Sequence, residues 1–327
     1  LPQEFPCRLT GDFRSPVLDL VNADGSFGCD LRYQGYEICD GKYNLKGLPA
    51  VYAAEEEAQT LIIYMKDQVT GLQVELLYGV LPEYDVITRS AKVINTEEDK
   101  IRLTKAQAAC IDFVHGEFDI ISFYGRHAME RNMQRTSVGH GAFVIGSRRG
   151  TSSHQYNPML ILAEKETTED AGICYGMSFV YSGGFKAEVE KDQFGQTRMQ
   201  MGLQEEQFSY PLKKGEEFVI PEVILTCSNQ GLEKLSQNLQ RCIRKNLCRG
   251  KYKEKVRPVL INSWEACYFD FTGEDIYHLA EQAKDLGIDM VVLDDGWFGS
   301  RNDDNSGLGD WKVNEKKLQG SLGDLIS

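Results

Sequence analysis

The sequence predicts a chain of two structural classes, a large antiparallel β-sandwich followed by a parallel α/β unit. Its length of 327 residues suits two domains better than one. The first two-thirds hold many short runs in which apolar and polar residues alternate between Gly, Asn and Asp, which is typical of antiparallel strands. From Pro258 onward, short apolar runs flank one amphipathic stretch, which indicates parallel strands joined by a helix.

The sandwich is predicted over residues 1–230. Alternation is clearest where a run meets a turn residue, as at Gly71 and Asn95. We expect strands at 60–67, 72–80, 85–94, 100–105, 143–145, 159–162, 175–181 and 218–225. So many strands indicate a large sandwich rather than one small sheet.

Residues 231–256 are predicted to form a linker helix and a linker. Apolar residues recur there at helical spacing, at Leu232, Leu235, Leu239, Ile243 and Leu247. A basic stretch at 249–257 follows. We interpret it as a solvated linker rather than an anion-binding patch, because a run of like charge repels itself and stays hydrated.

The α/β unit is predicted over residues 257–327. Apolar runs at 259–262 and 290–293 have the composition of buried strands. Between them, Thr272 is expected to cap a helix together with Asp275, and Gly287 is expected to end it. A strand, a helix and a second strand within about 35 residues predict a βαβ unit with parallel strands.

Composition excludes several classes of protein. The net charge of −13 argues against a nucleic-acid binder, which would show a basic face. No apolar run reaches the roughly 20 residues that span a bilayer. The nine cysteines are scattered without Cys-x-x-Cys spacing, so we expect reduced thiols in a cytoplasmic protein and neither a disulfide framework nor a zinc site. The first residue is Leu and no signal peptide follows, so the chain is expected to begin inside a longer protein.

Carboxylates and aromatic residues stand together where the predicted parallel strands end. Asp294 and Asp295 follow the second strand, and Trp264 follows the first. In parallel α/β domains, ligands bind at the carboxyl ends of the strands. A carboxylate accepts charge-assisted hydrogen bonds from sugar hydroxyls, and an indole covers the apolar face of a sugar ring. The pattern therefore points to a sugar-binding site.

Adjacent residues at a strand end diverge, so Asp294 and Asp295 do not suit a catalytic pair, which in a retaining glycosidase stands about 5–5.5 Å apart across the bond. Two other interpretations stay open at this point. The pair could be a helix N-cap plus a loop carboxylate, or Asp303 and Asp304 could help to hold a cation, although the EF-hand spacing is missing. The aromatic residues at 297 and 298 suit the site or simple packing equally well.

Several motifs occur in the same order and spacing as in one known family. They are GDFRSP at 11–16, GLPA at 47–50, RGTSSH at 149–154, NSWEA at 262–266, YFD at 268–270, LDDGWF at 293–298 with Arg301, and LGDW at 308–311. With these motifs the sequence resembles glycoside hydrolase family 36, the α-galactosidases, over essentially its whole length. The resemblance implies a β-supersandwich followed by the first strands and helices of a (β/α)8 TIM barrel.

The resemblance also implies roles for single residues. Asp294 and Asp295 would bind galactose hydroxyls, O4 and O6, and Trp264 would pack against the sugar at the bottom of the pocket. Trp311 and Arg301 would lie in pocket loops and bind substrate. The nucleophile and the acid/base are expected downstream of Ser327, so no catalytic residue is assigned here, the chain is expected to be truncated at both ends, and alone it is expected to be inactive.

For the complete protein, the resemblance implies hydrolysis of terminal α-linked galactose from melibiose and raffinose-type oligosaccharides by double displacement, without cofactor or metal. A homo-oligomer, a tetramer, is expected, with no nucleic-acid or membrane partner. Alternatives are a related α-N-acetylgalactosaminidase or galactosyltransferase and, from another class, a non-catalytic carbohydrate-binding module. The charged residues Arg126, Glu130, Arg131 and Arg135 are expected to form a subunit interface or a solvated loop.

Overall fold

The structure is a computed structural model that describes residues 2–8 and 11–327. The chain divides into two compact units, Leu1–Cys248 and Arg249–Ser327. Each unit has its own hydrophobic core, so each is described by itself.

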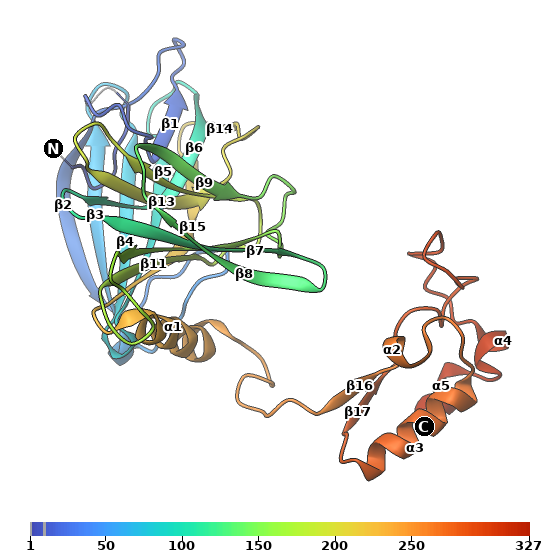
Figure 1. The fold of residues 1–327 in the computed structure, drawn as a ribbon. Helices are drawn as coiled ribbons and strands as arrows, with labels where there is room; N and C mark the ends of the chain where they lie inside the picture. Colours follow the sequence, from blue (N-terminus) through green and yellow to red (C-terminus); the bar gives the residue numbers. More distant parts are fainter. Residues whose placement is uncertain (1, 9–10) are drawn as a thin grey trace. The chain divides into compact units, whose positions relative to one another are not determined.

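The larger sheet of the first unit has nine antiparallel strands in the order β2-β3-β4-β5-β15-β11-β10-β7-β8 (Figure 1). Their bounds are β2 Leu31–Asp40, β3 Gln59–Asp67, β4 Gln73–Leu81, β5 Val86–Ile94, β7 Phe118–Arg126, β8 Met129–Ser137, β10 Tyr156–Glu164, β11 Cys174–Phe179 and β15 Glu217–Ser228. The long strand β15 pairs with β5 on one side and with β11 on the other, and thereby joins the two halves of the sheet.

The smaller sheet has six strands in the order β1-β6-β13-β12-β9, with β14 also paired to β6. Their bounds are β1 Leu18–Val21, β6 Ile101–Phe113, β9 Gly141–Gly146, β12 Phe185–Lys191, β13 Thr197–Leu203 and β14 Tyr210–Leu212. Strand β6 pairs with β1 and β14 near its beginning and with β13 near its end, so it runs through the middle of this sheet.

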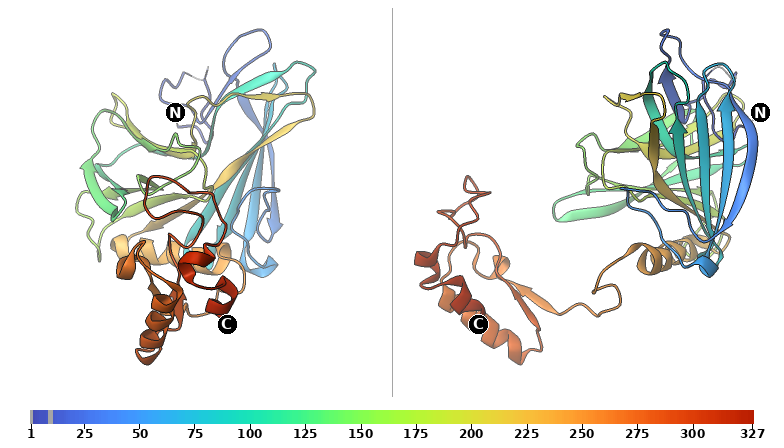
Figure 2. Two further views of the ribbon diagram at one scale, coloured as in Figure 1. Left: turned by 90° about the vertical axis from the view of Figure 1, so that its right-hand side faces the viewer. Right: turned by 180° about the vertical axis from the view of Figure 1, so that it is seen from behind.

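The two sheets pack face to face around one core (Figure 2). Side chains that alternate along a strand reach opposite faces of the sheet. In β15, Val223 belongs to the core between the sheets, while the next residue, Ile224, belongs to a second core on the outer face. This alternation produces the predicted sandwich.

Helix α1, Gly231–Cys242, covers the outer face of the larger sheet, where Leu235 and Leu239 are buried against it. Its last turn is a π-helix, η3, Ile243–Leu247, whereas the periodicity predicted an unbroken helix to Leu247. Asn246, in this wider turn, donates its side-chain amide to the Tyr52 carbonyl at 2.8 Å. Because the helix packs on the sandwich, the first compact unit extends to Cys248 and includes the helix that was predicted to be part of a linker.

The second unit contains the predicted βαβ arrangement. Its elements are β16 Leu260–Asn262, α2 Trp264–Cys267, α3 Gly273–Asp285, β17 Met290–Val292, α4 Glu315–Leu318 and α5 Leu322–Ile326. Strands β16 and β17 pair in parallel, as predicted. Thr272 and Asp275 form a capping box at the start of α3, and Gly287 follows the helix with a φ of +76°.

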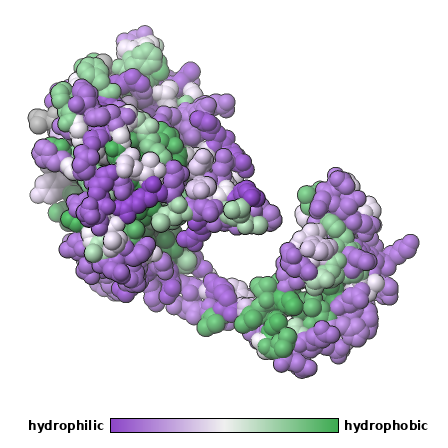
Figure 3. Space-filling view, viewed as in Figure 1, coloured by the Kyte–Doolittle hydropathy of each residue, from purple (hydrophilic) through white to green (hydrophobic). Residues whose placement is uncertain are grey.

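A small core holds the second unit together. Phe271, Ile276 and Leu318 are buried, and Trp297 packs against them. The strand pair is far less covered, since Leu260 is 52% exposed and Met290 is 42% exposed. Figure 3 shows apolar side chains gathered on the surface of this unit. Strands of a parallel sheet are normally buried on both faces, so these two strands have room for further covering elements.

The strands that the sequence predicted are all present, although several are longer; β6 extends to Phe113 instead of ending near residue 105. The charged run that was expected to form a subunit interface or a solvated loop lies in the β7–β8 hairpin and is not a loop; its members are Arg126, Glu130, Arg131 and Arg135. Arg135 is bonded there through its Nε to an oxygen of Asp119 at 2.8 Å. The subunit interface stays a prediction.

Eight of the cysteines are free thiols, namely Cys29, Cys39, Cys110, Cys174, Cys227, Cys242, Cys248 and Cys267. Within residues 2–8 and 11–327, no group of three or more His, Cys, Asp or Glu side chains has an arrangement that would hold a metal ion. In the same part of the chain, no helix combines the length and apolar character that crossing a bilayer would require.

Candidate functional site

The candidate site lies at the carboxyl ends of β16 and β17. Because the two strands are parallel, Asn262 at the end of β16 and the residues after β17 meet at one edge of the sheet. A hydrogen bond from the Ser263 amide to the Val292 carbonyl, 2.9 Å long, ties the two strand ends together. Trp264 directly follows Ser263, and Asp294 comes two residues after Val292.

Asp294 is held by uncharged donors. The Asn262 side-chain amide donates to its Oδ2 at 2.6 Å, and the amide of Asp295 donates to its Oδ1 at 2.7 Å. Its own backbone N–H donates to the Ser263 hydroxyl at 3.1 Å. Each carboxylate oxygen accepts one of these bonds, and an ionised carboxylate has about four acceptor positions in all. Asp294 therefore keeps the capacity to accept hydrogen bonds from a ligand.

Asp295 is paired with a cation, the guanidinium of Arg301. The Nε of Arg301 donates to both of its oxygens, at 2.7 and 2.8 Å, and the Gly296 amide donates to Oδ1 at 2.7 Å. The hydrogen bond from Arg301 holds the pKa of Asp295 below its ordinary value, and the Gly296 amide acts in the same direction. The two adjacent carboxylates thus diverge, as the sequence predicted.

Arg301 belongs to a loop that is fixed at its base. The Gly299 amide donates to the Lys312 carbonyl at 2.7 Å, and the Asn314 amide donates to the Trp297 carbonyl at 2.9 Å. The Arg301 residue is only 5% exposed. Its guanidinium lies 5.6 Å from the centre of the Phe269 ring. This loop therefore brings a buried cation to the strand end.

Trp264 stands at the start of the short helix α2. Its ring meets those of Tyr268 and Phe269 edge to face, with centroids 5.3 and 4.9 Å away. Its backbone amide donates to the Asn262 side-chain oxygen at 2.8 Å. Asn262 therefore contacts both Asp294 and Trp264, and links the two predicted sugar-binding elements.

Trp311 lies farther along the loop and is 66% exposed, with its ring 4.6 Å from that of Phe298. Phe298 is only 2% exposed, and Trp297 packs against the core of the unit. Both residues therefore pack the unit. No described contact joins Trp311 to Asp294 or Asp295, so the structure does not bring it together with the carboxylates.

Two alternative interpretations of the acidic residues are not favoured by the structure. Asp294 and Asp295 do not cap a helix, because the next described helix begins at Glu315. Asp303 accepts from the Asn305 amide at 2.8 Å, and Asp304 lies 3.5 Å from the Arg301 guanidinium. These two carboxylates therefore have partners within the loop.

The sequence did not predict the contacts of Asn262, Ser263 and Lys317. The signal for Asn262 was its place at the end of a strand parallel to the one before Asp294. Lys317 lies close enough to lower the pKa of Asp295, after the stronger effect of Arg301. No sequence pattern marked Lys317, because it comes from the helix after the loop.

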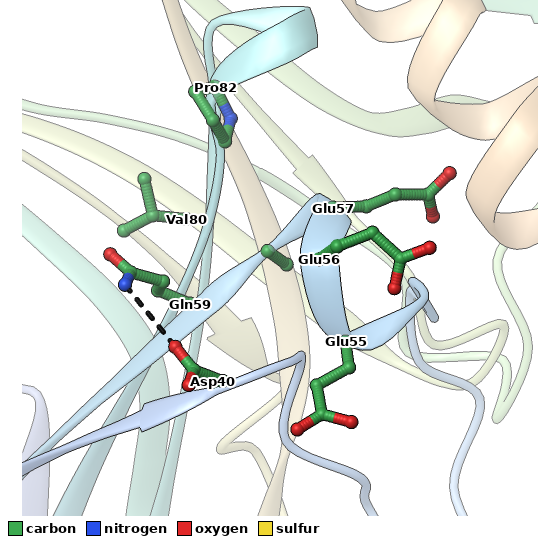
Figure 4. A pocket seen from close by; sticks show the side chains of 8 residues that line it. Asp40, Glu55, Glu56, Glu57, Gln59, Val80 and Pro82 are labelled. Carbon is green, nitrogen blue, oxygen red and sulfur yellow. Dashed lines mark hydrogen bonds between the residues drawn. The ribbon is translucent and has the colours of Figure 1, made fainter.

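A different hollow lies on the first unit, lined by Asp40, Glu55, Glu56 and Glu57 among others (Figure 4). The side chain of Glu55 points away from those of Glu56 and Glu57, and the Gln59 amide donates to Asp40 at 3.5 Å. These carboxylates do not converge on one point. The hollow contains none of the residues that the sequence singled out.

Comparison with known families gives two adjoining matches that cover nearly the whole chain. Residues 1–213 match the glycosyl hydrolase family 36 N-terminal domain, and residues 217–327 match the family described as melibiase. The boundary between the two matches falls before β15 and not at the limit of a compact unit.

The curated relatives are named as α-galactosidases. The chain is 62% identical over 327 residues to a bifunctional α-galactosidase/sucrose kinase of Mediterraneibacter gnavus, covering 100% of this chain and 35% of that protein. It is 45% identical to an α-galactosidase of Lactobacillus acidophilus, covering 99% of this chain and 44% of that protein. The chain thus spans less than half the length of the relatives it matches.

Solved structures have the same fold. The galactosidase domain of an α-galactosidase/sucrose kinase superposes with a TM-score of 0.95 at 62% identity, over 100% of this chain and 45% of that one. A family 36 α-galactosidase of Geobacillus stearothermophilus also gives a TM-score of 0.95, at 44% identity, over 99% of this chain and 45% of that one. The predicted fold, a large β-sandwich followed by the start of a barrel, is confirmed. The chain belongs to glycoside hydrolase family 36.

Proposed function

We propose that the protein containing this chain is a retaining α-galactosidase and that residues 257–327 form the first part of its catalytic barrel, which binds the sugar. Family membership and the names of the relatives support the activity. One observation carries the assignment of the site. Two carboxylates with unused acceptor positions stand at the end of a parallel strand pair, and Asn262 bonds both Asp294 and the backbone of Trp264 there.

The proposed substrates are terminal α-linked galactosides, including melibiose and raffinose-type oligosaccharides. Solved variants of the Geobacillus stearothermophilus enzyme, 44% identical to this chain, are complexes with raffinose and with stachyose. Each of these sugars ends in an α-linked galactose. The similarity of the chains supports the same substrate class for this protein.

In the proposed mechanism, Asp294 and Asp295 accept hydrogen bonds from galactose hydroxyls, O4 and O6. Trp264 covers the apolar face of the ring at the bottom of the pocket, and Trp311 borders the pocket from its loop. These contacts gain strength as the sugar is held for attack, which is how binding energy lowers the barrier. The nucleophile and the acid/base, which complete the double displacement, would come from barrel strands beyond residue 327, so this chain alone would be inactive.

We further propose that the complete protein is a cytoplasmic homo-oligomer, with the sandwich providing subunit contacts. Eight free thiols in the described part of the chain support a reducing compartment. The β7–β8 hairpin supports an interface, because Met129 and Met133 on it are 50% and 56% exposed. Tetramer formation and the domain limits 1–230, 231–256 and 257–327 stay predictions.

The function is tested on the complete protein with matched p-nitrophenyl glycosides. We expect hydrolysis of the α-galactoside, with the first sugar product in the α configuration by NMR, because double displacement retains the anomer. Preference for the α-N-acetylgalactosaminide, or transfer of galactose to a sugar acceptor in place of hydrolysis, would instead support the sibling enzymes. Sugar binding without turnover of any glycoside would support the carbohydrate-binding module.

A further inference from the structure

We propose that Arg301 is a positioning residue, which holds the Asp295 carboxylate for the sugar and offsets its charge without contacting the sugar itself. This inference rests on the proposed function, since it assumes that Asp295 binds galactose. It changes the role expected from the sequence, where Arg301 was counted among the residues that bind substrate.

The contacts of the guanidinium carry the proposal. Its Nε donates to both oxygens of Asp295, at 2.7 and 2.8 Å. Its Nη1 donates to the Ser306 carbonyl at 2.5 Å, and its Nη2 lies 3.5 Å from Asp304 Oδ1. The side chain is only 4% exposed. Each nitrogen therefore faces a group of this chain, and the guanidinium has little free surface to offer a sugar.

Asp295 itself stays available. Its Oδ1 accepts from both Arg301 and Gly296, whereas its Oδ2 accepts only from Arg301. An ionised carboxylate oxygen has about two acceptor positions. Oδ2 can therefore still accept a hydrogen bond from a sugar hydroxyl, and the contact with Arg301 fixes the direction in which that bond points.

Charge gives the second reason for a cation here. Asp294 and Asp295 are adjacent, and a neutral sugar that displaces water would bring two negative charges into a less polar environment, where like charges repel more strongly. Asp294 accepts from the uncharged Asn262, while Asp295 is paired with Arg301. One guanidinium offsets one of the two charges and so allows both carboxylates to stay ionised.

The backbone is shaped around this contact. At Gly307, where φ is +86°, an added Cβ would approach the Cβ of Arg301 to 3.1 Å. At Gly296, where φ is +89°, an added Cβ would approach the Phe269 ring to 3.0 Å. Glycine at these two positions lets the loop close tightly over the guanidinium. Asp303, Asp304 and Lys317 are the other charged side chains that face Arg301 or Asp295.

Arg301 also fixes the loop through Ser306, so a test must separate positioning of Asp295 from support of the loop. A double-mutant cycle does this on the complete protein. The kcat/KM for p-nitrophenyl α-galactoside is measured for the wild type, Arg301→Met, Asp295→Asn and the double variant. We expect Arg301→Met to lower kcat/KM by about 10- to 100-fold, the range for one hydrogen bond to a charged group, and Asp295→Asn to lower it by about 100-fold or more.

The double variant decides the matter. If Arg301 acts through Asp295, the kcat/KM of the double variant equals or exceeds that of Asp295→Asn, to within about twofold. If Arg301 contacts the sugar or only supports the loop, the two losses multiply, and the proposal is overturned. Arg301→Lys keeps the charge and one donor, so it should recover part of the loss; an effect equal to Arg301→Met would also contradict the proposal.

Two controls complete the design. Lys316→Met removes one positive charge from an exposed position of helix α4, near the site but outside it, and is expected to leave kcat/KM within about twofold of the wild type. A wild-type protein that does not hydrolyse the α-galactoside would show that the proposed function has failed. An active wild type with multiplicative losses would show that only the role of Arg301 has failed.

Discussion

The side-chain amide of Asn262 donates to the Asp294 carboxylate at 2.6 Å and so joins the ends of the two parallel strands. The oxygen of the same amide accepts from the Trp264 backbone. One residue therefore contacts both the carboxylate of Asp294 and the backbone of Trp264, two residues that we propose to bind the sugar. Asn262 opens the NSWEA motif, but the resemblance implied no role for it, whereas the structure gives it contacts with both residues.

Asn262→Ala is expected to lower kcat/KM of the complete protein by about 10-fold or more, because the lost bond is made to a charged group. Asn262→Asp should cost more, since it places a second negative charge next to Asp294. Steady-state kinetics on an α-galactoside checks both changes. Equal activity of Asn262→Ala and the wild type, at an unchanged Tm, would contradict this role.

Arg198→Met is expected to destabilise the sandwich by about 3–5 kcal/mol, the range for breaking a buried ion pair from one side. Arg198 is fully buried on β13 and donates to Asp12 at 2.7 Å and to Asp112 at 2.8 Å. Denaturant unfolding of the complete protein, followed through its sandwich transition, measures the loss. The matched control is Arg32→Met, whose pair with Asp30 is exposed and should contribute about 1 kcal/mol or less.

The buried ion pairs of Arg198 with Asp12 and Asp112 also predict that the stability of the sandwich depends on pH. Burial raises the pKa of Asp12, but hydrogen bonds from Arg14 and Arg198 outweigh burial and leave that pKa well below its ordinary value. A carboxyl group whose pKa is lower in the folded state stabilises the fold above its unfolded pKa, about 3.9, and this contribution is lost as the pH falls through the folded pKa. Melting curves from neutral pH down to pH 2 should therefore fall less steeply for Asp12→Asn than for the wild type. Parallel curves would count against this contribution.

The capping box of α3 predicts a smaller effect in the second unit. Thr272 accepts from the Asp275 amide, and Asp275 accepts from the Thr272 amide at 2.8 Å. Thr272→Ala should cost about 1 kcal/mol of stability, whereas Thr272→Ser should cost little, because serine keeps the accepting hydroxyl. Hydrogen exchange of the α3 amides reports this change locally, and unchanged exchange in the alanine variant would be evidence against it.

The second unit was predictable because its signals are local. Thr272, Asp275 and Gly287 mark the ends of one helix within a short stretch, and the apolar runs beside it read as buried strands. Because both strands are parallel, the place of a residue after a strand was enough to predict that Trp264, Asp294 and Asp295 lie at one edge of the sheet. The bond between Asp295 and Arg301 was not predictable, because it depends on the conformation of the loop and not on periodicity.

Strands β8, β12 and β13 of the sandwich were not predicted, for two physical reasons. Strand β8 is exposed along most of its length and is held by pairing with β7, so it has no apolar face to mark it. Strands β12 and β13 bury Glu188, Arg198 and Gln200, whose polar character hides the alternation. Besides Asp112, the partners of Arg198 are Asp12 and the Ser15 carbonyl, contacts made across more than 180 positions of sequence.

We propose above all that Asp294 and Asp295 hold galactose in an α-galactosidase. The decisive measurement is kcat/KM of the complete protein for p-nitrophenyl α-galactoside, comparing the wild type with Asp294→Asn and Asp295→Asn. We expect robust wild-type turnover and a loss of at least about 100-fold in each variant, at an unchanged Tm, because each change removes charge-assisted bonds to the sugar. Turnover within a few-fold of the wild type in both variants, or no turnover of the α-galactoside by the wild type, would show that the two carboxylates do not have this role.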